Sequence, residues 1–326
     1  MSKSSFEQLR YKLLALHTFV AVAHCGRGIF GSDFGTVAFV VQNSHIKMYK
    51  ALFRQLFDEL GAVDSVEQKE KWFLEGKGVF YAYPDKFLKI ASYPIAYWVS
   101  DRLLTILNEC KPLTEFAAPR KGLTTGDNDT FARLWFEIAL AKFGINGNNH
   151  AKWYPMTKGG DFRRWYGNRE YVINWENDGS EIKSRLSLKT KKPTIRNITF
   201  QMKEGFTWTT ISSGGFSCRY TPKGALFDNG GCTLFSDRNL KKYGAFLNSK
   251  VASRYLEFLS PTLNFQPGDI GKILFKEDID NLPLNTENLI RISQSDWDSY
   301  ETSWEFTENP IIRIQQPTLE QAFNTW

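Results

Sequence analysis

The segment from Lys152 to Asn168, KWYPMTKGGDFRRWYGN, constrains the fold of this chain more than any other segment. It is too charged for a strand of a hydrophobic core and too aromatic for a simple solvated surface. Its cations are Lys152, Lys158, Arg163 and Arg164, and its rings are Trp153, Tyr154, Phe162, Trp165 and Tyr166. Cations interleaved with rings suit nucleic acid, because cations neutralise phosphates and rings stack on bases. A basic hairpin whose rings cover a core has the same composition, so the sequence alone leaves both interpretations open.

Two adjacent glycines, Gly159 and Gly160, lie in the middle of this segment, which we call the central stretch. Without a Cβ atom, glycine lets the main chain come close to a ligand. We therefore include both glycines, the four cations Lys152, Lys158, Arg163 and Arg164, and the ring of Trp165 among the candidate contacts.

The charge of the chain is unevenly distributed. The net charge is only +6 over 326 residues, a length that favours two domains. Residues 152–223 contain 14 Lys and Arg against 6 Asp and Glu, a balance of +8. Residues 276–326 contain 3 against 10, a balance of −7. This asymmetry favours a polyanion as the partner of the middle of the chain.

Several classes of protein are disfavoured by the sequence. The four cysteines are scattered without a CxxC pair, which argues against a zinc ribbon and a secreted disulfide framework. The four histidines do not suggest a metal site. No signal peptide follows Met1, and no apolar run approaches the ~20 residues of a membrane span. We therefore expect a cytoplasmic protein without a membrane partner or a bound metal.

Hydrophobic periodicity predicts alternating helices and strands in the first hundred residues. The expected elements are a helix and then a strand over 5–24, a buried strand over 35–43, an amphipathic helix over 48–60, a helix or turn over 65–73, and a strand passing into a helix over 91–104. Such alternation is typical of an α/β fold with parallel strands. However, the glycine loop and the D/N/S-P-P-Y/F tetrapeptide of amino methyltransferases do not occur, and the sequence has no Pro-Pro dipeptide.

Two further loops have the composition of phosphate-binding segments. After a polar connector over 113–120, the loop Gly122–Asp129 combines glycines with Thr124 and Thr125. The segment Trp208–Tyr220 repeats this theme with Ser212, Ser213, Gly214 and Arg219. We expect hydroxyls and backbone N–H groups of both loops to face phosphates, next to the central stretch on one basic surface. Ordinary, unrelated surface loops have the same composition.

The remaining predicted elements concern the second half of the chain. They are a strand over 131–135, a strand over 171–175 with a turn at 177–179, strand-turn-strand over 226–234, one amphipathic helix over 243–259 and a tight turn over 264–270. In the helix, Leu247, Val251, Tyr255 and Leu259 are expected to form one buried stripe.

Seven segments resemble the PglX family, adenine-specific DNA methyltransferases of bacterial BREX phage-defence systems. They are SVEQKEKWFLEGKG (65–78), ASYPIAYWVSDR (91–102), GLTTGDNDTF (122–131), the central stretch (152–168), NWENDG (174–179), PTLNFQPGDI (261–270) and DWDSYETSWEF (296–306). They occur along essentially the whole chain, so the resemblance is specific.

The resemblance implies a two-part enzyme. One part is a Rossmann-like catalytic domain that binds S-adenosylmethionine and a flipped adenine, and the other reads an asymmetric site in double-stranded DNA. The implied fold class is α/β, with a partial Rossmann-like methyltransferase domain followed by an α+β target-recognition domain. Residues 1–112 would be the distal part of the catalytic domain, and residues 113–326 the DNA target-recognition domain with an acidic C-terminal tail.

Because the cofactor and tetrapeptide motifs are missing, the chain is expected to be a truncated or split member of the family. It would hold no S-adenosylmethionine and be inactive alone, with double-stranded DNA and the missing methyltransferase half or other BREX proteins as partners. The alternative is a non-catalytic interaction or scaffold protein of the defence system. An unrelated autonomous enzyme has little support, because no nucleophile–base pair or carboxylate pair stands out.

Overall fold

The computed structural model describes residues 6–31, 35–58, 62–90, 93–100, 102, 109–145, 151–187, 190–259, 264–276 and 285–325. The chain forms two compact units. Unit 1 comprises Met1–Glu115, Val251–Asn264 and Lys272–Glu277, and unit 2 comprises Phe116–Lys250, Phe265–Gly271 and Asp278–Trp326. The first change of unit lies inside the predicted connector 113–120. The later segments of unit 1 make it discontinuous in sequence, and the roles assigned to the two predicted domains stay a prediction.

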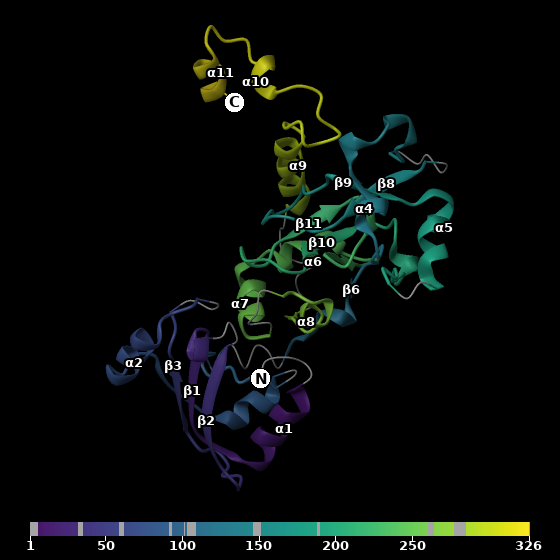
Figure 1. Cartoon of the computed structure of the whole chain (residues 1–326). Helices are drawn as coiled ribbons and strands as arrows, with labels where there is room; N and C mark the ends of the chain where they lie inside the picture. Colours follow the sequence, from purple (N-terminus) through teal and green to yellow (C-terminus); the bar gives the residue numbers. More distant parts are fainter. Residues whose placement is uncertain are drawn as a thin grey trace. The chain divides into compact units, whose positions relative to one another are not determined.

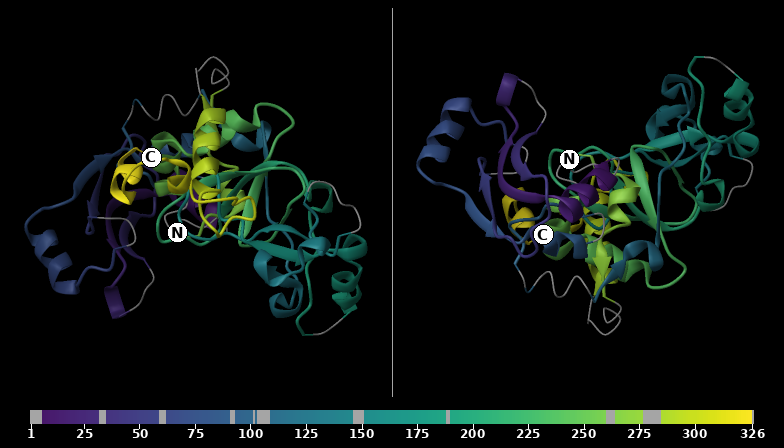
Figure 2. Two further views of the ribbon diagram at one scale, coloured as in Figure 1. Left: turned by 90° about the horizontal axis from the view of Figure 1, so that it is seen from above. Right: turned by 90° about the horizontal axis from the view of Figure 1, so that it is seen from below.

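Unit 1 is built on a four-stranded sheet (Figure 1). Its strands are β1 (Thr18–Gly26), β2 (Thr36–Gln42), β3 (Ala51–Gln55) and β4 (Val79–Ala82), in the order β2-β1-β3-β4. The β1–β3 pair is parallel, whereas the β1–β2 and β3–β4 pairs are antiparallel. Both views of Figure 2 show the purple and blue strands of this sheet side by side. The fold is therefore mixed α/β, and its Rossmann-like character stays a prediction.

The helices of unit 1 agree in part with the sequence pattern. Unit 1 also contains α1 (Glu7–Leu16), α2 (Val66–Leu74), the 3-10 turns η2 (Ile29–Gly31), η3 (Pro84–Lys89) and η4 (Leu113–Glu115), and the antiparallel pair β5 (Lys111–Pro112) and β14 (Leu274–Phe275). The predicted helix–strand succession over 5–24 is confirmed by α1 and β1. The predicted segment over 65–73 is confirmed by α2, whose first turn is capped by the Ser65 side chain.

The amphipathic helix predicted over 48–60 is wrong. Its described part contains β3, which runs parallel to β1. Ala51 and Phe53 are fully buried, whereas Leu52 and Arg54, which alternate with them, are partly exposed. This burial has the two-residue period of a strand, and pairing with β1 outweighs the weak helical periodicity of the segment.

Two other predictions for unit 1 need correction. The strand over 35–43 exists as β2, but it is not buried, since Phe39 and Val40 are exposed. As an edge strand, β2 has a neighbour on only one side. In the segment 91–104, residues 93–100 form turns instead of a strand, and most of the rest lies outside the described residues. Its apolar character still serves the core, because Tyr97 stacks on Phe53 at 4.9 Å between ring centroids.

Unit 2 contains two four-stranded sheets. One has the order β11-β10-β13-β6 and the other β12-β8-β9-β7. The strands are β6 (Ala118–Arg120), β7 (Ala132–Leu134), β8 (Trp153–Thr157), β9 (Tyr171–Asn174), β10 (Gly205–Thr209), β11 (Cys218–Thr221), β12 (Leu226–Phe227) and β13 (Gly231–Phe235). The β12–β8 pair is parallel and the other pairs are antiparallel.

Unit 2 also contains several helices, of which α6 lies next to β10 and β11 (Figure 1). They are α4 (Asn128–Phe131), α5 (Glu176–Ser184), α6 (Leu240–Leu247), α8 (Pro267–Ile270), α9 (Thr286–Trp297), α10 (Pro310–Arg313) and α11 (Leu319–Thr325), with 3-10 turns η5 (Trp135–Glu137), η6 (Leu140–Lys142), η7 (Arg185–Ser187) and η8 (Ile198–Phe200). Leu123, Phe131, Met156, Ile173 and Leu226 belong to a buried cluster that joins the second sheet to the loop before α4. This core holds the candidate loops in place.

The single helix predicted over 243–259 is wrong. The segment forms α6 and then α7 (Lys250–Leu259), which are separate helices. Asn248 ends α6, and its side chain accepts a hydrogen bond from Cys218 N and donates one to Cys218 O, both at 2.9 Å. Leu247 and Tyr255 are buried as expected, but Val251 is 55% exposed. Because the helix is interrupted at Asn248, the predicted stripe is not continuous.

The predicted strands of unit 2 have mixed outcomes. The strand over 131–135 is only partly right, because Phe131 ends α4 and β7 has three residues. The strand over 171–175 is confirmed by β9. Strand-turn-strand over 226–234 is confirmed by β12 and β13. These two strands are not paired with each other, since β12 pairs with β8 and β13 with β10.

Candidate nucleic-acid interface

The central stretch leaves strand β8 at Thr157 and then crosses toward β11 without regular structure. Gly159 and Gly160 have φ values of +95° and +123°, a region that favours glycine. A Cβ on Gly159 would lie 2.9 Å from Gly230 O, and one on Gly160 would lie 2.7 Å from Asn168 Nδ2. Both glycines are therefore required by the internal packing of the crossing, whatever the ligand.

Hydrogen bonds attach the central stretch to the edge of the β11-β10-β13-β6 sheet. The Thr209 hydroxyl donates to Gly160 O at 2.8 Å. Trp165 N donates to Cys218 O at 3.2 Å, and Trp165 O accepts from Tyr220 N at 2.8 Å. Trp165 thus extends the sheet by one residue, and its positive φ of +71° turns the chain after this bridge. The crossing is an ordered part of unit 2.

The cations of the central stretch are held by rings. Lys158 Nζ lies 4.5 Å from the ring centre of Tyr171, and the Arg164 guanidinium lies 5.4 Å from that of Phe162. Arg164 is exposed, while Lys158 and Lys152 are half-buried. Arginine and lysine over ring faces keep their charge available to an anion. Arg164 is therefore the cation of the stretch that is best placed for a phosphate.

Arg163 differs from its neighbour because it is already paired. Its guanidinium forms an ion pair with Asp296 of α9, and it lies 5.0 Å from the ring centre of Trp297. Its Nε also donates to Tyr166 O at 3.0 Å. The expectation that Arg163 and Arg164 act alike on phosphates therefore needs revision, since Arg163 connects the central stretch to the C-terminal segment.

The Ser212–Gly215 loop lies beside the central stretch. A Cβ on Gly214 would lie 3.1 Å from Phe162 Cβ. Ser213 and Gly214 are exposed and Ser212 is half-buried. The structure therefore places the second predicted loop next to Phe162 of the central stretch.

The Gly122–Gly126 loop is used mainly for internal contacts. Thr124 exchanges backbone hydrogen bonds with Thr194 at 2.8 and 2.9 Å. The Thr125 side chain is buried, and its hydroxyl donates to Asn128 Oδ1 at 2.7 Å. A Cβ on Gly122 would clash with the Phe227 carbonyl. Since the Thr125 hydroxyl is buried and already donates to Asn128, we leave Thr125 out of the interface, whereas Thr124 is half-buried.

The turn at 227–231 connects this loop to the central stretch. Leu123 N donates to Phe227 O at 3.1 Å, and Asp228 N donates to Thr157 O at 3.1 Å. The Asp228 carboxylate accepts from Gly230 N at 2.7 Å and Gly231 N at 2.8 Å. Burial raises the pKa of Asp228 to about 6, while these N–H groups and the charge of Lys158 oppose the rise. This organising carboxylate was missed by the sequence analysis, although the DNGG tetrapeptide is a turn signal.

Arg219 was expected on the same basic surface as the other candidate contacts, but it does not lie on the surface. It belongs to β11 and its side chain is only 1% exposed. The register of the strands places it opposite Thr207, on the interior face of the sheet. Its Nη2 donates to Thr209 Oγ1 at 3.3 Å. Burial, together with the charge of Arg163, lowers the pKa of Arg219 to about 10.

The C-terminal segment packs on the central stretch, which the sequence analysis did not foresee. The Ser293 hydroxyl of α9 bonds to Arg164 O at 2.9 Å and Tyr166 O at 3.2 Å. A Cβ on Gly167 would lie 2.8 Å from the Trp297 ring. The aromatic residues of WDSYETSW were the available signal for such packing.

The same segment continues across the neighbouring sheet. Trp304 lies 4.8 Å from the Arg169 guanidinium and makes an edge-on contact with Phe143 at 5.3 Å. Trp135 Nε1 donates to Thr302 O at 3.0 Å. The acidic residues between Trp297 and Trp304 are therefore held next to the basic segment of unit 2.

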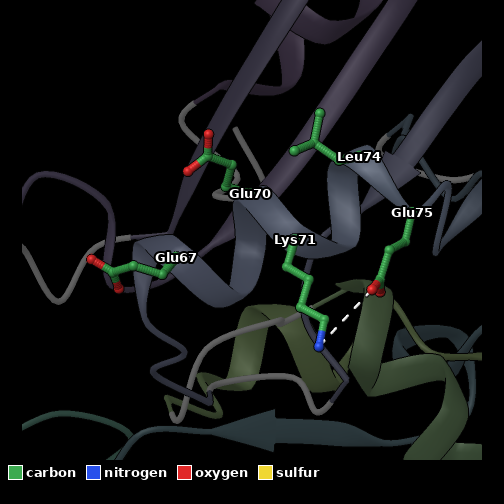
Figure 3. Close-up of a pocket in the computed structure, with 5 residues that line it drawn as sticks. All are labelled: Glu67, Glu70, Lys71, Leu74 and Glu75. Atoms are coloured by element: carbon green, nitrogen blue, oxygen red, sulfur yellow. Dashed lines mark ion pairs between the residues drawn. The ribbon is translucent and has the colours of Figure 1, made fainter.

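A shallow hollow in unit 1 has a different character. It is lined by Glu67, Glu70, Lys71, Leu74 and Glu75, all on α2 (Figure 3). Lys71 and Glu75 form an exposed ion pair at 3.9 Å, so the free charges are carboxylates. Such a surface repels a polyanion. Within the part of the chain that the structure describes, no three metal-ligating side chains cluster, and no helix is long and apolar enough to cross a membrane.

The relatives of the chain are adenine-specific methyltransferases. It is 39% identical over 325 residues to the adenine-specific methyltransferase BrxX of Escherichia coli O9:H4 (strain HS), covering 96% of this chain and 26% of that protein. It is 37% identical over 352 residues to the adenine-specific methyltransferase PglX of Lacticaseibacillus casei (strain Zhang), covering 100% and 29%. The chain is a homologue of these BREX methyltransferases. The resemblance to the PglX family is thereby confirmed, and the chain spans between a quarter and a third of the length of these relatives.

No protein-family model matches the chain. Among solved structures, it is similar to the type IIG restriction endonuclease BpuSI, with a TM-score of 0.35 and 10% identity, covering 99% of this chain and 44% of that one.

Proposed function

We propose that this chain is the DNA-recognition portion of a site-specific N6-adenine DNA methyltransferase of the PglX family. The observation that carries the proposal is the exposed Arg164, which lies over the Phe162 ring beside the Ser212–Gly215 loop. The relatives named as adenine-specific methyltransferases support the class of substrate. The local charge of +8 over residues 152–223 supports a polyanion as the partner.

The proposed interface joins the central stretch and the Ser212–Gly215 loop. Cations and exposed backbone would contact phosphates, and side chains held by them would contact bases. The candidate contacts are Lys152, Lys158, Gly160, Arg164, Trp165, Ser212, Ser213 and Gly214. Arg163 supports this surface through Asp296, and Gly159 supports it by packing. Phosphate contacts hold the protein on the duplex, so this chain would place the DNA for a reaction carried out elsewhere.

Two glycines at the end of β1 give no support for a site for S-adenosylmethionine, the cofactor implied by the family. The glycines after β1 are used for internal packing. A Cβ on Gly26 would lie 2.9 Å from the Phe57 ring, and one on Gly28 would lie 2.6 Å from Asp64 O. Since a side chain at either position would meet the protein itself, internal packing already explains both glycines. We propose that this chain alone neither binds S-adenosylmethionine nor methylates DNA.

A second candidate function is a non-catalytic interaction protein of the defence system. The observation that favours it lies at the C-terminal end, where Ile312 of α10 and Leu319 of α11 are 72% and 79% exposed. Apolar side chains exposed on short helices suit a protein partner. This function requires no DNA binding.

Salt dependence of DNA binding distinguishes the two functions. Fluorescence anisotropy with labelled duplex DNA should show binding whose logarithmic affinity falls linearly with the logarithm of salt concentration. A chain that binds no duplex at low salt would contradict the recognition function and leave the interaction function.

A further inference from the structure

A buried cation lies beneath the central stretch. Arg219 Nε and Nη1 are shielded from solvent and have no hydrogen-bond partner, and Nη2 has only the contact to Thr209 Oγ1. A guanidinium stays protonated under all physiological conditions. A full positive charge with two unpartnered nitrogens is therefore enclosed in unit 2.

No acidic side chain compensates this charge within the described residues. The ion pairs of that part of the chain do not include Arg219, and the nearby charges that act on the strand are Arg163 and Arg164. Arg163 already pairs with Asp296. The carboxylate of Asp296 is thus used by Arg163, and the charge of Arg163 adds to that of Arg219. Because an unpaired buried cation is strongly destabilising, this cluster is suited to receive an anion.

The surroundings of Arg219 supply hydroxyls and a glycine-rich cover. Thr207 and Thr209 lie on the same face of β10 as the guanidinium, and Thr209 also donates to Gly160 O at 2.8 Å. Gly160 is exposed, and the Thr209 hydroxyl that donates to its carbonyl oxygen also accepts from the guanidinium, so Thr209 connects the exposed segment to the buried charge. A shift of this short segment would open the site from the proposed interface.

We propose that Arg219 and Thr209, beneath Gly160, form a binding site for one phosphate oxyanion, which in the DNA complex is a backbone phosphate. A phosphate oxyanion accepts hydrogen bonds and carries the charge that the guanidinium lacks. The assignment of this phosphate to the DNA backbone rests on the proposed function. The site itself does not, because inorganic phosphate carries the same charge and accepts the same hydrogen bonds. The site adds a buried anchor to the exposed contacts of Arg164.

The test uses two probes on the complete 326-residue chain. Thermal unfolding is followed in sodium phosphate and in sodium chloride of equal ionic strength, and duplex DNA binding is followed by anisotropy. Arg219→Met removes the charge but keeps an apolar side chain that a buried site tolerates. Arg313→Met is the matched control, because Arg313 of α10 is exposed and paired with Glu308. Phosphate should raise the melting temperature of the wild type and the control but not of Arg219→Met, which should bind DNA about 10- to 100-fold more weakly.

Each outcome separates the site from the proposed function. Phosphate stabilisation that depends on Arg219, without any duplex binding, supports the oxyanion site but contradicts DNA recognition. No phosphate effect together with unchanged DNA affinity in Arg219→Met refutes the site and leaves DNA recognition intact. If Arg219→Met does not fold, Arg219→Lys replaces it. An absent phosphate effect on the wild type and full DNA affinity of Arg219→Lys then refute the site.

Discussion

Arg163 and Asp296 form an ion pair although 133 residues separate them in sequence. The pair connects the most basic segment of the chain to its acidic C-terminal segment. Because Arg163 also stacks on Trp297, the helix α9 is attached by charge and by an aromatic ring. The acidic segment is therefore part of unit 2, and the two neighbouring arginines of the central stretch have different roles.

We expect Arg163→Ala to loosen the attachment of α9. The pair is partly exposed, so the loss of unfolding free energy should be about 1 kcal/mol, including the ring contact. Asp296→Ala should cost less, and the double variant should show coupling. Urea unfolding of the four proteins in a double-mutant cycle measures this effect. A coupling energy of zero would mean that the two side chains do not interact in solution.

Arg164→Ala should instead leave stability almost unchanged and weaken DNA binding. If Arg164 contacts a phosphate, the loss should be similar for all sequences, and the salt slope should fall by about one unit. Anisotropy titrations at four salt concentrations measure both quantities. Arg313→Ala serves as the control, since its charge is neutralised by Glu308. Equal slopes for Arg164→Ala and the wild type would remove Arg164 from the interface.

A methyl group at Gly122 should be strongly destabilising. Its Cβ would clash with the carbonyls of Phe227 and Asp228, which cannot move without opening β12. Overpacking of this kind costs about 1–3 kcal/mol. Gly268→Ala in α8 is the matched control, because no atom lies within 4 Å of its added Cβ. Similar midpoints of urea unfolding for the two variants would contradict the close packing of the 122–126 loop.

Asp228 should make stability fall as pH rises. Its folded-state pKa of about 6 exceeds the ordinary carboxyl value of 3.8, so the folded state binds the proton more tightly. By linkage, the contribution of Asp228 to the free energy of unfolding is most favourable below pH 4 and is lost as pH rises through 6. Asp228→Asn keeps an oxygen for Gly230 and Gly231 but cannot ionise. Between pH 4 and 7, the wild type should lose about 1–3 kcal/mol relative to this variant.

Urea unfolding of both proteins at pH 5 and pH 7.5 measures this difference. A stability gap between them that is the same at both pH values would show that Asp228 does not titrate in this range.

The isolated chain should show no heat of binding for S-adenosylmethionine in calorimetry. The reason is the missing cofactor motif in the sequence, together with the packing of Gly26 and Gly28 against Phe57 and Asp64. Micromolar affinity of the wild-type chain would overturn this expectation.

The sequence by itself determined the features that depend on local composition. The charges and rings of residues 152–168, the turn at Asp228–Gly231 and strands such as β9 follow from residue type and short periodicity. The resemblance to the PglX family followed from long motifs, which depend on residue order alone.

Only the tertiary structure decided which of these groups reach the surface. The sequence pattern treats Arg163, Arg164 and Arg219 alike, yet one is paired with α9, one is exposed and one is buried beneath Gly160. Ala51–Gln55, within the segment 48–60, likewise became a strand because β1 offered a partner, not because of its own pattern. Pairing and burial depend on contacts between residues far apart in the chain, and such contacts leave no mark on local composition.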